Sequence, residues 1–376
     1  MRSIVILVAS LCLLLQSRPL HADIILSSWN IQTLATNGVV FEGDLQRTEA
    51  DFAMLRQARD RVGADVFALE EVTSPHAVSK VFPLSDYLIC FPGQYDADAK
   101  GLAPHYPADQ LGGIKPRCYD KETSLPDPPA GTLRKQYVAV VIKRASGITV
   151  EAVSDLPQLG LAVEEENNAT QQMEIRNLRW GLETTLKKDN KTFRLLAVHL
   201  KSGCTLGALL ANTWHDPNWI WAPNGANDHA CMTLARQMRP LRKWIADVRP
   251  LGIPFVVLGD FTRRVDAEEA NPNSPDLWPI LTGQATAETE DDVALSRVPE
   301  GTPSRKACWP EEDGTDFENA IDYMIFSPGF RPQDWAASYL KFRYTDLIDP
   351  VTGLPLTKAR DAKRMSDHCP IVVRLK

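Results

Sequence analysis

Six short strings, spread along nearly the whole chain, each set a polar or acidic residue against a strand-like apolar run. In chain order they are 28–30 (SWN), 69–72 (LEEV), 198–200 (VHL), 257–261 (VLGDF), 320–323 (AIDY) and 366–368 (SDH). Side chains so distant in sequence can act together only if several strands deliver them to one edge of a sheet. The pattern therefore predicts a β-sheet scaffold whose strand ends carry a functional site.

The first 22 residues differ from the rest of the chain. Arg2 is followed by an apolar run from Ile4 to Leu15 and later by a small residue, Ala22, which is typical of a cleaved secretory signal peptide. A run of about 12 apolar residues is too short to span a bilayer. We expect residues 1–22 to be a signal peptide, the mature protein to be secreted or periplasmic, and no stable insertion into a membrane.

The charge of the mature chain bears on its partners. Removing Arg2 and Arg18 leaves 39 basic against 48 acidic residues, a net charge of −9. Such a chain is poorly suited to coating nucleic acid by bulk attraction. A metal-dependent enzyme can instead neutralise phosphate locally, so the charge disfavours a passive binder more than a nuclease.

Six cysteines remain in the mature chain: Cys90, Cys118, Cys204, Cys231, Cys308 and Cys369. An even number in an exported protein indicates three disulfides, although six cysteines allow about 15 pairings and buried thiols are the alternative. Chain order suggests that each cysteine pairs with its neighbour in this series, the first with the second and so on. The absence of CxxC spacing argues against a zinc site.

The rest of the chain, residues 23–376, reads as one domain of alternating strands and helices. Apolar or alternating runs predict strands at 23–29, 66–69, 136–143, 180–186, 193–200, 253–258, 321–326 and 370–375. Apolar residues at helical spacing predict helices at 45–62 and 228–248. The loops 91–131 and 262–310 are long enough to be functional or disordered.

The order of the six strings resembles the endonuclease/exonuclease/phosphatase superfamily, which includes deoxyribonuclease I type enzymes. The resemblance covers roughly residues 24–375 and includes Lys201 and Ser202 after the third string. It implies an α+β fold of four layers, an α/β/β/α sandwich in which two mixed β-sheets pack face to face with helices outside. We expect the protein to act as a monomer.

Metal ligands follow from the chemistry of phosphodiester hydrolysis, which needs a cation on the phosphate, an oriented water and a protonated leaving group. Glu71 offers a hard oxygen ligand suited to Mg²⁺ or Mn²⁺, with a solvated carboxylate as the alternative. Asn30 would ligate the ion or orient that carboxylate, unless it is only a turn residue. The resemblance makes Asp367 a direct ligand or a residue that supports one, and Ca²⁺ is a candidate structural ion.

Proton transfer falls to histidines and carboxylates. By resemblance, His368 is the general base or acid on the water side and Asp322 holds its ring. Asp260 follows so apolar a run that an unpaired carboxylate there would be costly, so we expect it to position or deprotonate the attacking water. His199 is expected to face the phosphate oxygens or the leaving group.

Substrate contacts and departures from the family pattern complete the site. Arg179 is a candidate phosphate clamp, and Tyr137 is a weaker one. An exposed structural arginine and a packed strand tyrosine are the respective alternatives. Glu70 stands where the family commonly has Gln, and Thr262 stands where it has Asn. Thr262 offers one hydroxyl donor instead of an amide, and losing one such donor can cost on the order of 10²–10³ in rate.

Three functions fit these features. The first is a nuclease that cuts DNA or RNA, and the second is a phosphoesterase acting on lipid or small substrates such as sphingomyelin or inositol phosphates. The third is a non-catalytic binding protein on the same fold.

Residues 213–225 contain three tryptophans, which favour either a packed loop or an aromatic platform for bases or lipid.

Overall fold

The computed structural model describes residues 23–36, 47–100, 113–125, 135–167, 172–205, 209, 226–265, 277–283, 294–299, 302, 308–309 and 320–376. The expected signal peptide and the tryptophan-rich segment 213–225 lie outside these residues. Within this part of the chain, none of the helices has the length and apolar character needed to span a bilayer.

Two mixed β-sheets form the centre of the molecule. In the described residues the first has seven strands, in the order β13 (Tyr339–Lys341), β14 (Ile371–Leu375), β1 (Ile24–Leu34), β2 (Val66–Val72), β5 (Tyr137–Lys143), β3 (Tyr87–Phe91) and β4 (Arg117–Tyr119). The second has five, in the order β12 (Asp322–Phe326), β11 (Phe255–Asp260), β10 (Lys191–His199), β9 (Gly181–Lys188) and β6 (Thr149–Leu156). Each sheet contains one parallel pair, β1 with β2 and β10 with β11, among antiparallel neighbours.

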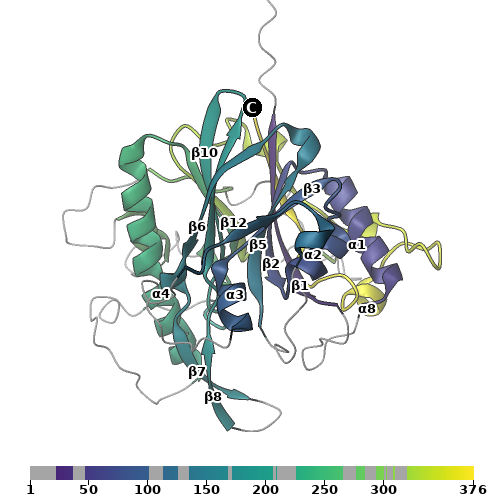
Figure 1. Ribbon diagram of the computed structural model, residues 1–376, viewed down its shortest axis with the longest axis horizontal. Coiled ribbons are helices and arrows are strands. Elements are labelled where there is room, and N and C mark those ends of the chain that lie inside the picture. The colour runs from purple at the N-terminus through teal and green to yellow at the C-terminus, as the bar shows by residue number, and fades with distance from the viewer. Residues whose placement is uncertain are drawn as a thin grey trace, which may run out of the picture.

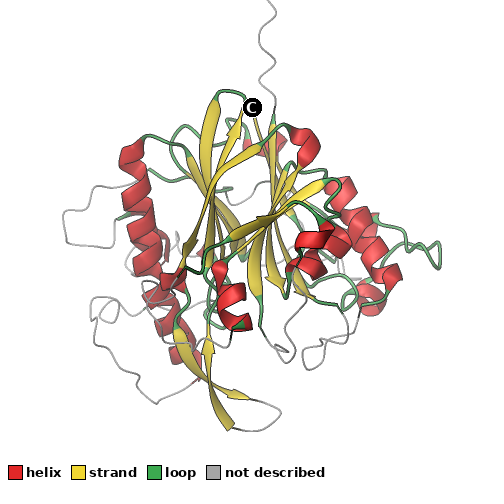
Figure 2. Cartoon of the chain, viewed as in Figure 1, coloured by secondary structure: helices red, strands yellow, loops and turns green. Residues whose placement is uncertain are grey.

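The sheets pack face to face, and helices cover their outer faces (Figures 1 and 2). The core between the sheets is apolar and fully buried, with Leu26 and Val66 from one sheet and Leu195 and Val256 from the other. Helices α1 (Glu49–Val62) and α2 (Pro75–Val81) cover the first sheet, while α4 (Ala226–Val248) and α6 (Leu277–Thr282) cover the second. The expected four-layer α/β/β/α sandwich is confirmed.

Shorter elements decorate this sandwich. They are the helices α3 (Gly93–Ala99), α7 (Trp335–Ser338) and α8 (Lys358–Asp361) and a two-stranded ribbon of β7 (Ala162–Asn167) and β8 (Gln172–Asn177). The ribbon projects from the sandwich beyond α3 (Figure 1). The strands β3, β4 and β6 were not predicted from the sequence. The strand β6 is largely polar and solvent-facing, β4 falls within the run 91–131 that reads as a loop, and β3 ends where that run begins.

Helix α1 begins later than its apolar spacing predicts. Thr48 is its N-cap, forming a capping box with Asp51, and Gly63 ends it in the left-handed conformation. The strand predicted at 23–29 instead continues to Leu34, and the strand predicted at 66–69 continues to Val72. Both extensions pass through register shifts, so apolar periodicity alone could not locate their ends.

Three disulfides join cysteines in the chain order suggested by the sequence. Cys90 and Cys118 lie opposite each other on β3 and β4. The other two bonds are Cys204–Cys231 and Cys308–Cys369. The last bond fastens the chain immediately before β14, one residue after His368.

Candidate active site

Ends of strands from both sheets meet at one edge of the sandwich. In the second sheet, His199 on β10 pairs with Asp260 on β11, which pairs with Asp322 on β12. Asn30 on β1 provides the link to the first sheet. Gly259 lets this edge form, because its φ of 147° and its approach to the main chain of Val198 leave no room for a Cβ. The edge therefore gathers polar side chains from strands far apart in sequence.

Left-handed backbone conformations shape the first sheet where it enters the site. Gln32, Thr33 and Glu71 have φ values of 43°, 51° and 60°, at the register shifts of β1 and β2. Non-glycine residues in this region cost about 1–3 kcal/mol each and persist only where their surroundings enforce them. Such bulges re-aim side chains, and here they direct the Glu71 carboxylate toward the second sheet.

Three hydrogen-bond donors orient the Glu71 carboxylate. Asn30 Nδ2 donates to Oε1 at 3.2 Å, while Thr33 N and Gln136 Nε2 donate to Oε2 at 3.2 and 2.8 Å. The side chain remains about 20% exposed. A partly exposed, fixed carboxylate of this kind fits a hard cation such as Mg²⁺ or Mn²⁺.

Asn30 connects the two sheets through its buried amide. Its Nδ2 donates to Glu71 of the first sheet and, at 3.1 Å, to Asp260 Oδ2 of the second. Its Oδ1 accepts the amide of Gln32 at 3.0 Å. In this arrangement Asn30 orients the carboxylates, the second of the two roles that the sequence suggests for it.

Asp260 lies between two imidazoles. Its Oδ2 is 3.6 Å from His199 Nε2 and 3.8 Å from His368 Nε2, and its Oδ1 accepts the amide of Thr262 at 2.6 Å. Burial raises the pKa of Asp260 to about 7; the nearby charge of Asp322 adds to this rise, and His368 opposes it. A carboxylate with this pKa can both release and accept a proton near neutral pH.

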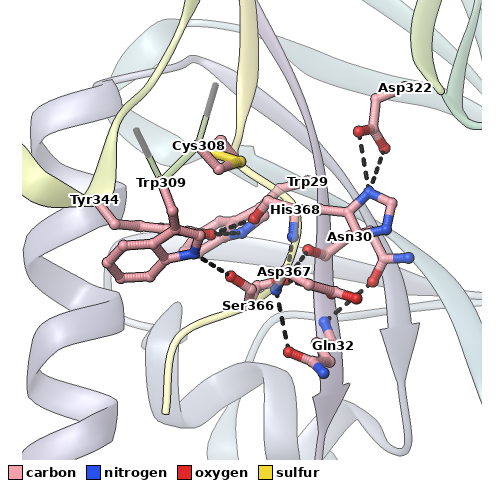
Figure 3. The surroundings of a disulfide bond; sticks show 11 residues. Trp29, Asn30, Gln32, Cys308, Trp309, Asp322, Tyr344, Ser366, Asp367 and His368 are labelled. Atoms are coloured by element: carbon pink, nitrogen blue, oxygen red, sulfur yellow. Dashed lines mark hydrogen bonds and ion pairs between the residues drawn. A yellow bond between two sulfur atoms is a disulfide. The ribbon is translucent and has the colours of Figure 1, made fainter. Parts of the chain in front are cut away.

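His368 and Asp322 form a close pair (Figure 3). His368 Nδ1 lies 3.0 and 3.1 Å from the two Asp322 oxygens. Burial alone would lower the pKa of His368, but the carboxylates, Asp322 foremost, outweigh it and hold the pKa well above its usual value. This surrounding favours the protonated form of His368, and its Nε2 is directed toward Asp260 at 3.8 Å.

Hydrogen bonds from aromatic side chains hold the main chain at His368 in place (Figure 3). Tyr344 Oη donates to the His368 carbonyl at 2.6 Å, and Trp29 Nε1 donates to Tyr344 Oη at 2.8 Å. Trp309 Nε1 donates to the carbonyl of Ser366 at 3.1 Å. These buried aromatic residues and the adjacent disulfide fix the histidine backbone.

His199 has the opposite electrostatic character. It is 3% exposed, and burial lowers its pKa well below the usual value, with the positive charges of Arg179, His368 and Lys201 adding to the fall. Its Nδ1 has no hydrogen-bond partner among the described residues. One imidazole is thus neutral and the other cationic within a single site, a separation that assigns distinct acid and base roles.

The described residues offer two places for a metal ion. Ligand atoms of Asp260, Asp322 and His368 lie within 4.8 Å of one another, a compact cluster. However, His368 Nδ1 lies 3.0 Å from Asp322, and the raised pKa of His368 favours a positively charged ring, which would repel a cation at this place. The partly exposed carboxylate of Glu71 lies 3.9 Å from His199, whose lowered pKa favours the neutral ring, so its chemistry fits a divalent cation better.

Other predicted residues lie at varying distances from this centre. Arg179 Nη2 donates to Gln136 Oε1 at 2.6 Å, which joins it to Glu71 through one amide. Asp367 is exposed, and Ser366 Oγ donates to its Oδ1 at 3.5 Å. Thr262 lies beside Asp260, but its hydroxyl donates to the carbonyl of Lys201 at 2.6 Å.

Tyr137 does not reach the site. It is 1% exposed, packs against Phe91 and Tyr95, and donates its hydroxyl to Asp98 at 2.9 Å. The sequence analysis missed its neighbour Gln136, which contacts Glu71. Alternation along a strand could have identified it, because successive side chains point to opposite faces. The packed-tyrosine alternative is the one that the structure shows.

Comparison with known proteins gives structural matches only. An endonuclease/exonuclease/phosphatase family protein from Bacteroides thetaiotaomicron matches with a TM-score of 0.50 and 13% identity, over 94% of this chain and 97% of that one. A humanized D. rerio TDP2 matches with a TM-score of 0.49 and 14% identity, over 94% and 99%. A mannosyl-6-phosphatase from B. thetaiotaomicron VPI-5482 gives 0.49 and 12%, over the same shares.

No family model and no curated protein sequence matches this chain. At such low identity, the structural likeness establishes the arrangement of the main chain and leaves the activity to be argued from the site. The first of the matches spans nearly all of both chains. The chain therefore has the fold of the endonuclease/exonuclease/phosphatase superfamily.

Proposed function

We propose that this protein is a metal-dependent phosphoesterase, and specifically an endonuclease that hydrolyses phosphodiester bonds of nucleic acid. The observation that carries the proposal is the position of Asp260. It lies within 4 Å of a neutral and a cationic imidazole and is joined to Glu71 by the amide of Asn30. Burying these groups together is costly, and a catalytic role explains why the fold maintains them.

The residues divide the reaction between them. A Mg²⁺ or Mn²⁺ ion held by Glu71 would supply positive charge to the phosphate oxygens. Asp260, with its pKa of about 7, accepts the proton of the attacking water. His368 is kept cationic by Asp322 and stabilises negative charge that develops on the phosphate. His199, a neutral donor, meets a phosphate or leaving-group oxygen.

Arg179 extends the site toward the substrate. Its guanidinium is joined to Glu71 through Gln136, so its position is coupled to that of the metal ligand. A cation beside the metal suits a phosphodiester anion, and Arg can bind two phosphate oxygens at once. We assign Arg179 the role of phosphate clamp. Asp367, which is exposed, would supply a further carboxylate to the ion or support one of its ligands.

The proposed place of action is outside the cytoplasm. Three disulfides fit a secreted or periplasmic protein, because reducing compartments keep thiols free. We extend the proposal to a mature protein of one domain, residues 23–376, which acts after removal of the signal peptide.

Hydrolysis by the purified mature protein tests the function. Plasmid DNA, RNA, sphingomyelin and a chromogenic phosphodiester would each be incubated with Mg²⁺ or with EDTA. We expect cleavage of nucleic acid in Mg²⁺ and none in EDTA. Cleavage of sphingomyelin alone would redirect the proposal to a lipid phosphodiesterase. No cleavage of any substrate would indicate a non-catalytic binding protein.

Thr262 should limit the rate. It is a β-branched residue with a φ of 54°, and its hydroxyl is committed to the carbonyl of Lys201. Replacing Thr262 by Asn, which tolerates this conformation and offers amide donors to the phosphate, should raise kcat by about 10-fold or more. Thr262→Gly relieves the backbone equally but offers no donor. Equal rates for the two variants, measured on the preferred substrate, would contradict this assignment.

A further inference from the structure

Two segments from opposite ends of the chain hold the two halves of the site. The first is the bulge of β1 at Gln32 and Thr33, whose main chain orients the Glu71 carboxylate through the Thr33 amide. The second is the segment that leads into His368. They touch directly, because Ser366 Oγ donates to the Asn30 carbonyl at 2.8 Å and Asp367 N donates to Gln32 Oε1 at 3.1 Å. Their relative position therefore sets the distance between the metal ligand and the catalytic histidine.

One guanidinium joins these two segments. Arg47 donates hydrogen bonds of 2.6–3.1 Å to five main-chain carbonyls, those of Ile31, Gln32, Thr33, Arg364 and Met365. Three of these carbonyls belong to the β1 bulge and two to the segment before His368. Buried main-chain oxygens in irregular backbone require such donors, and Arg offers five N–H groups in one rigid plane. Here Nη2 shares its two N–H groups among the carbonyls of Ile31, Gln32 and Met365.

Arg47 immediately precedes the N-cap of helix α1, which fixes its main chain. Thr48, the next residue, is the N-cap of this helix, and its amide donates to Asp51 Oδ2 at 2.7 Å. The other oxygen of Asp51 accepts Arg364 Nε at 2.6 Å. The helix N-terminus, the β1 bulge and the segment before His368 are therefore fastened to one another at a single point outside the substrate site.

We propose that Arg47 is a positioning residue for the reaction, fixing the Glu71 side of the site relative to the His368 side. The inference rests on the proposed function, and Arg47 would act on the reaction through the main-chain carbonyls that it contacts. The left-handed residues of the bulge persist only because their surroundings enforce them, and Arg47 makes three contacts with that bulge. Without it, the Thr33 amide and Ser366 would shift, and misplacement by about 1 Å can cost on the order of 10² in rate.

Arg47→Lys tests the proposal because lysine keeps the charge but has only three donors at one point and no planar fork. We expect kcat to fall about 10- to 100-fold, with KM changed less than about 3-fold. Because the Thr33 amide orients Glu71, the dissociation constant for Mn²⁺, measured by electron paramagnetic resonance without substrate, should rise about 5-fold or more.

Arg144→Lys is the matched control. Arg144 also donates to main-chain carbonyls, those of Leu84 and Asp120 at 3.0 and 2.8 Å, but it follows β5 at the end away from the site. This variant should keep the wild-type kcat and Mn²⁺ affinity. If the Arg47 and Arg144 variants lost kcat and Mn²⁺ affinity to the same extent, Arg47 would be an ordinary structural residue. A wild-type protein inactive on every substrate would instead reject the proposed function, and the Mn²⁺ comparison would still stand.

Hydrogen exchange in the wild-type protein keeps the proposal testable even if Arg47→Lys does not fold. The amides of Thr33 and Asp367 both lie in the fastened segments and both donate to side chains. If Arg47 couples the segments, these amides should open together and show protection within about 3-fold of each other. Protection factors that differ by more than about 10-fold would show that the two segments move independently and would overturn the proposal.

Discussion

Replacing Glu71 by Gln should reduce hydrolysis of the preferred phosphodiester by on the order of 10³-fold or more. Gln keeps the size of the side chain and can still contact Asn30 and Gln136, but it removes the negative charge that would hold the cation. The expected fall in rate therefore comes from the removed charge and not from a change in packing. It would be measured as kcat at saturating Mg²⁺, alongside the thermal unfolding midpoint, which should change little.

Glu151→Gln provides the control for this prediction. Glu151 is an exposed glutamate on β6 that pairs with Lys187 at 3.5 Å and accepts a hydrogen bond from Thr192 Oγ1 at 3.5 Å, so its charge has no role in the proposed site. Its variant should keep the full rate. Wild-type protein that retains full activity after EDTA treatment would contradict the metal-dependent account, whatever the Glu71 variant does.

The second large effect concerns the pair of His368 and Asp322. His368→Ala should lower kcat by about 10²- to 10⁴-fold, the usual range for a group that transfers or stabilises a proton. Asp322→Asn should do nearly as much harm, because the Asp322 oxygens hold His368 Nδ1 and keep the ring charged. The His199→Ala variant should fall in the same range, since no other neutral imidazole lies in the described site.

The double variant Asp322→Asn/His368→Ala separates an orienting role from an independent one. If Asp322 acts only through the His368 ring, the loss of kcat in the double variant should equal the loss of kcat in His368→Ala alone. A double loss equal to the product of the two single losses would show that Asp322 serves another group, such as a bound metal. Kinetics on a chromogenic phosphodiester would give both values under identical conditions.

Much of the scaffold could be predicted because burial leaves a clear trace in the sequence. Apolar runs located the central strands, and a polar residue at the end of each run located the edge where they meet. The pairing of Asp322 with His368 followed from a resemblance in motif order, and the structure places the two in contact. The four-layer fold was likewise expected only from that resemblance. The structure shows its physical basis, because each sheet packs apolar side chains on both of its faces.

The rest of the site depends on irregular backbone that has no simple sequence signature. Glu71 reaches the second sheet because residues of β1 and β2 have left-handed backbone conformations. Gln and Thr do not favour this conformation, so their presence in a strand does not predict it. Gln136 is neutral and belongs to no motif, so nothing in the sequence marks it as a site residue. Alternation along the strand nevertheless puts it on the opposite face from Tyr137. Five of the groups that Arg47 contacts are main-chain carbonyl oxygens, which every residue carries, so no sequence motif could reveal them as its partners.

In the proposed mechanism Glu71 holds the metal, Asp260 accepts the proton of the attacking water, and Asp322 keeps His368 cationic. Calorimetric titration with Mn²⁺ tests this division of roles, using the wild type, Glu71→Gln and Asp322→Asn. We predict that Glu71→Gln weakens the site by about 100-fold or more, while Asp322→Asn changes the affinity by less than about 5-fold. The reverse result, with binding lost in Asp322→Asn and kept in Glu71→Gln, would place the ion in the Asp260–Asp322–His368 cluster and contradict the account.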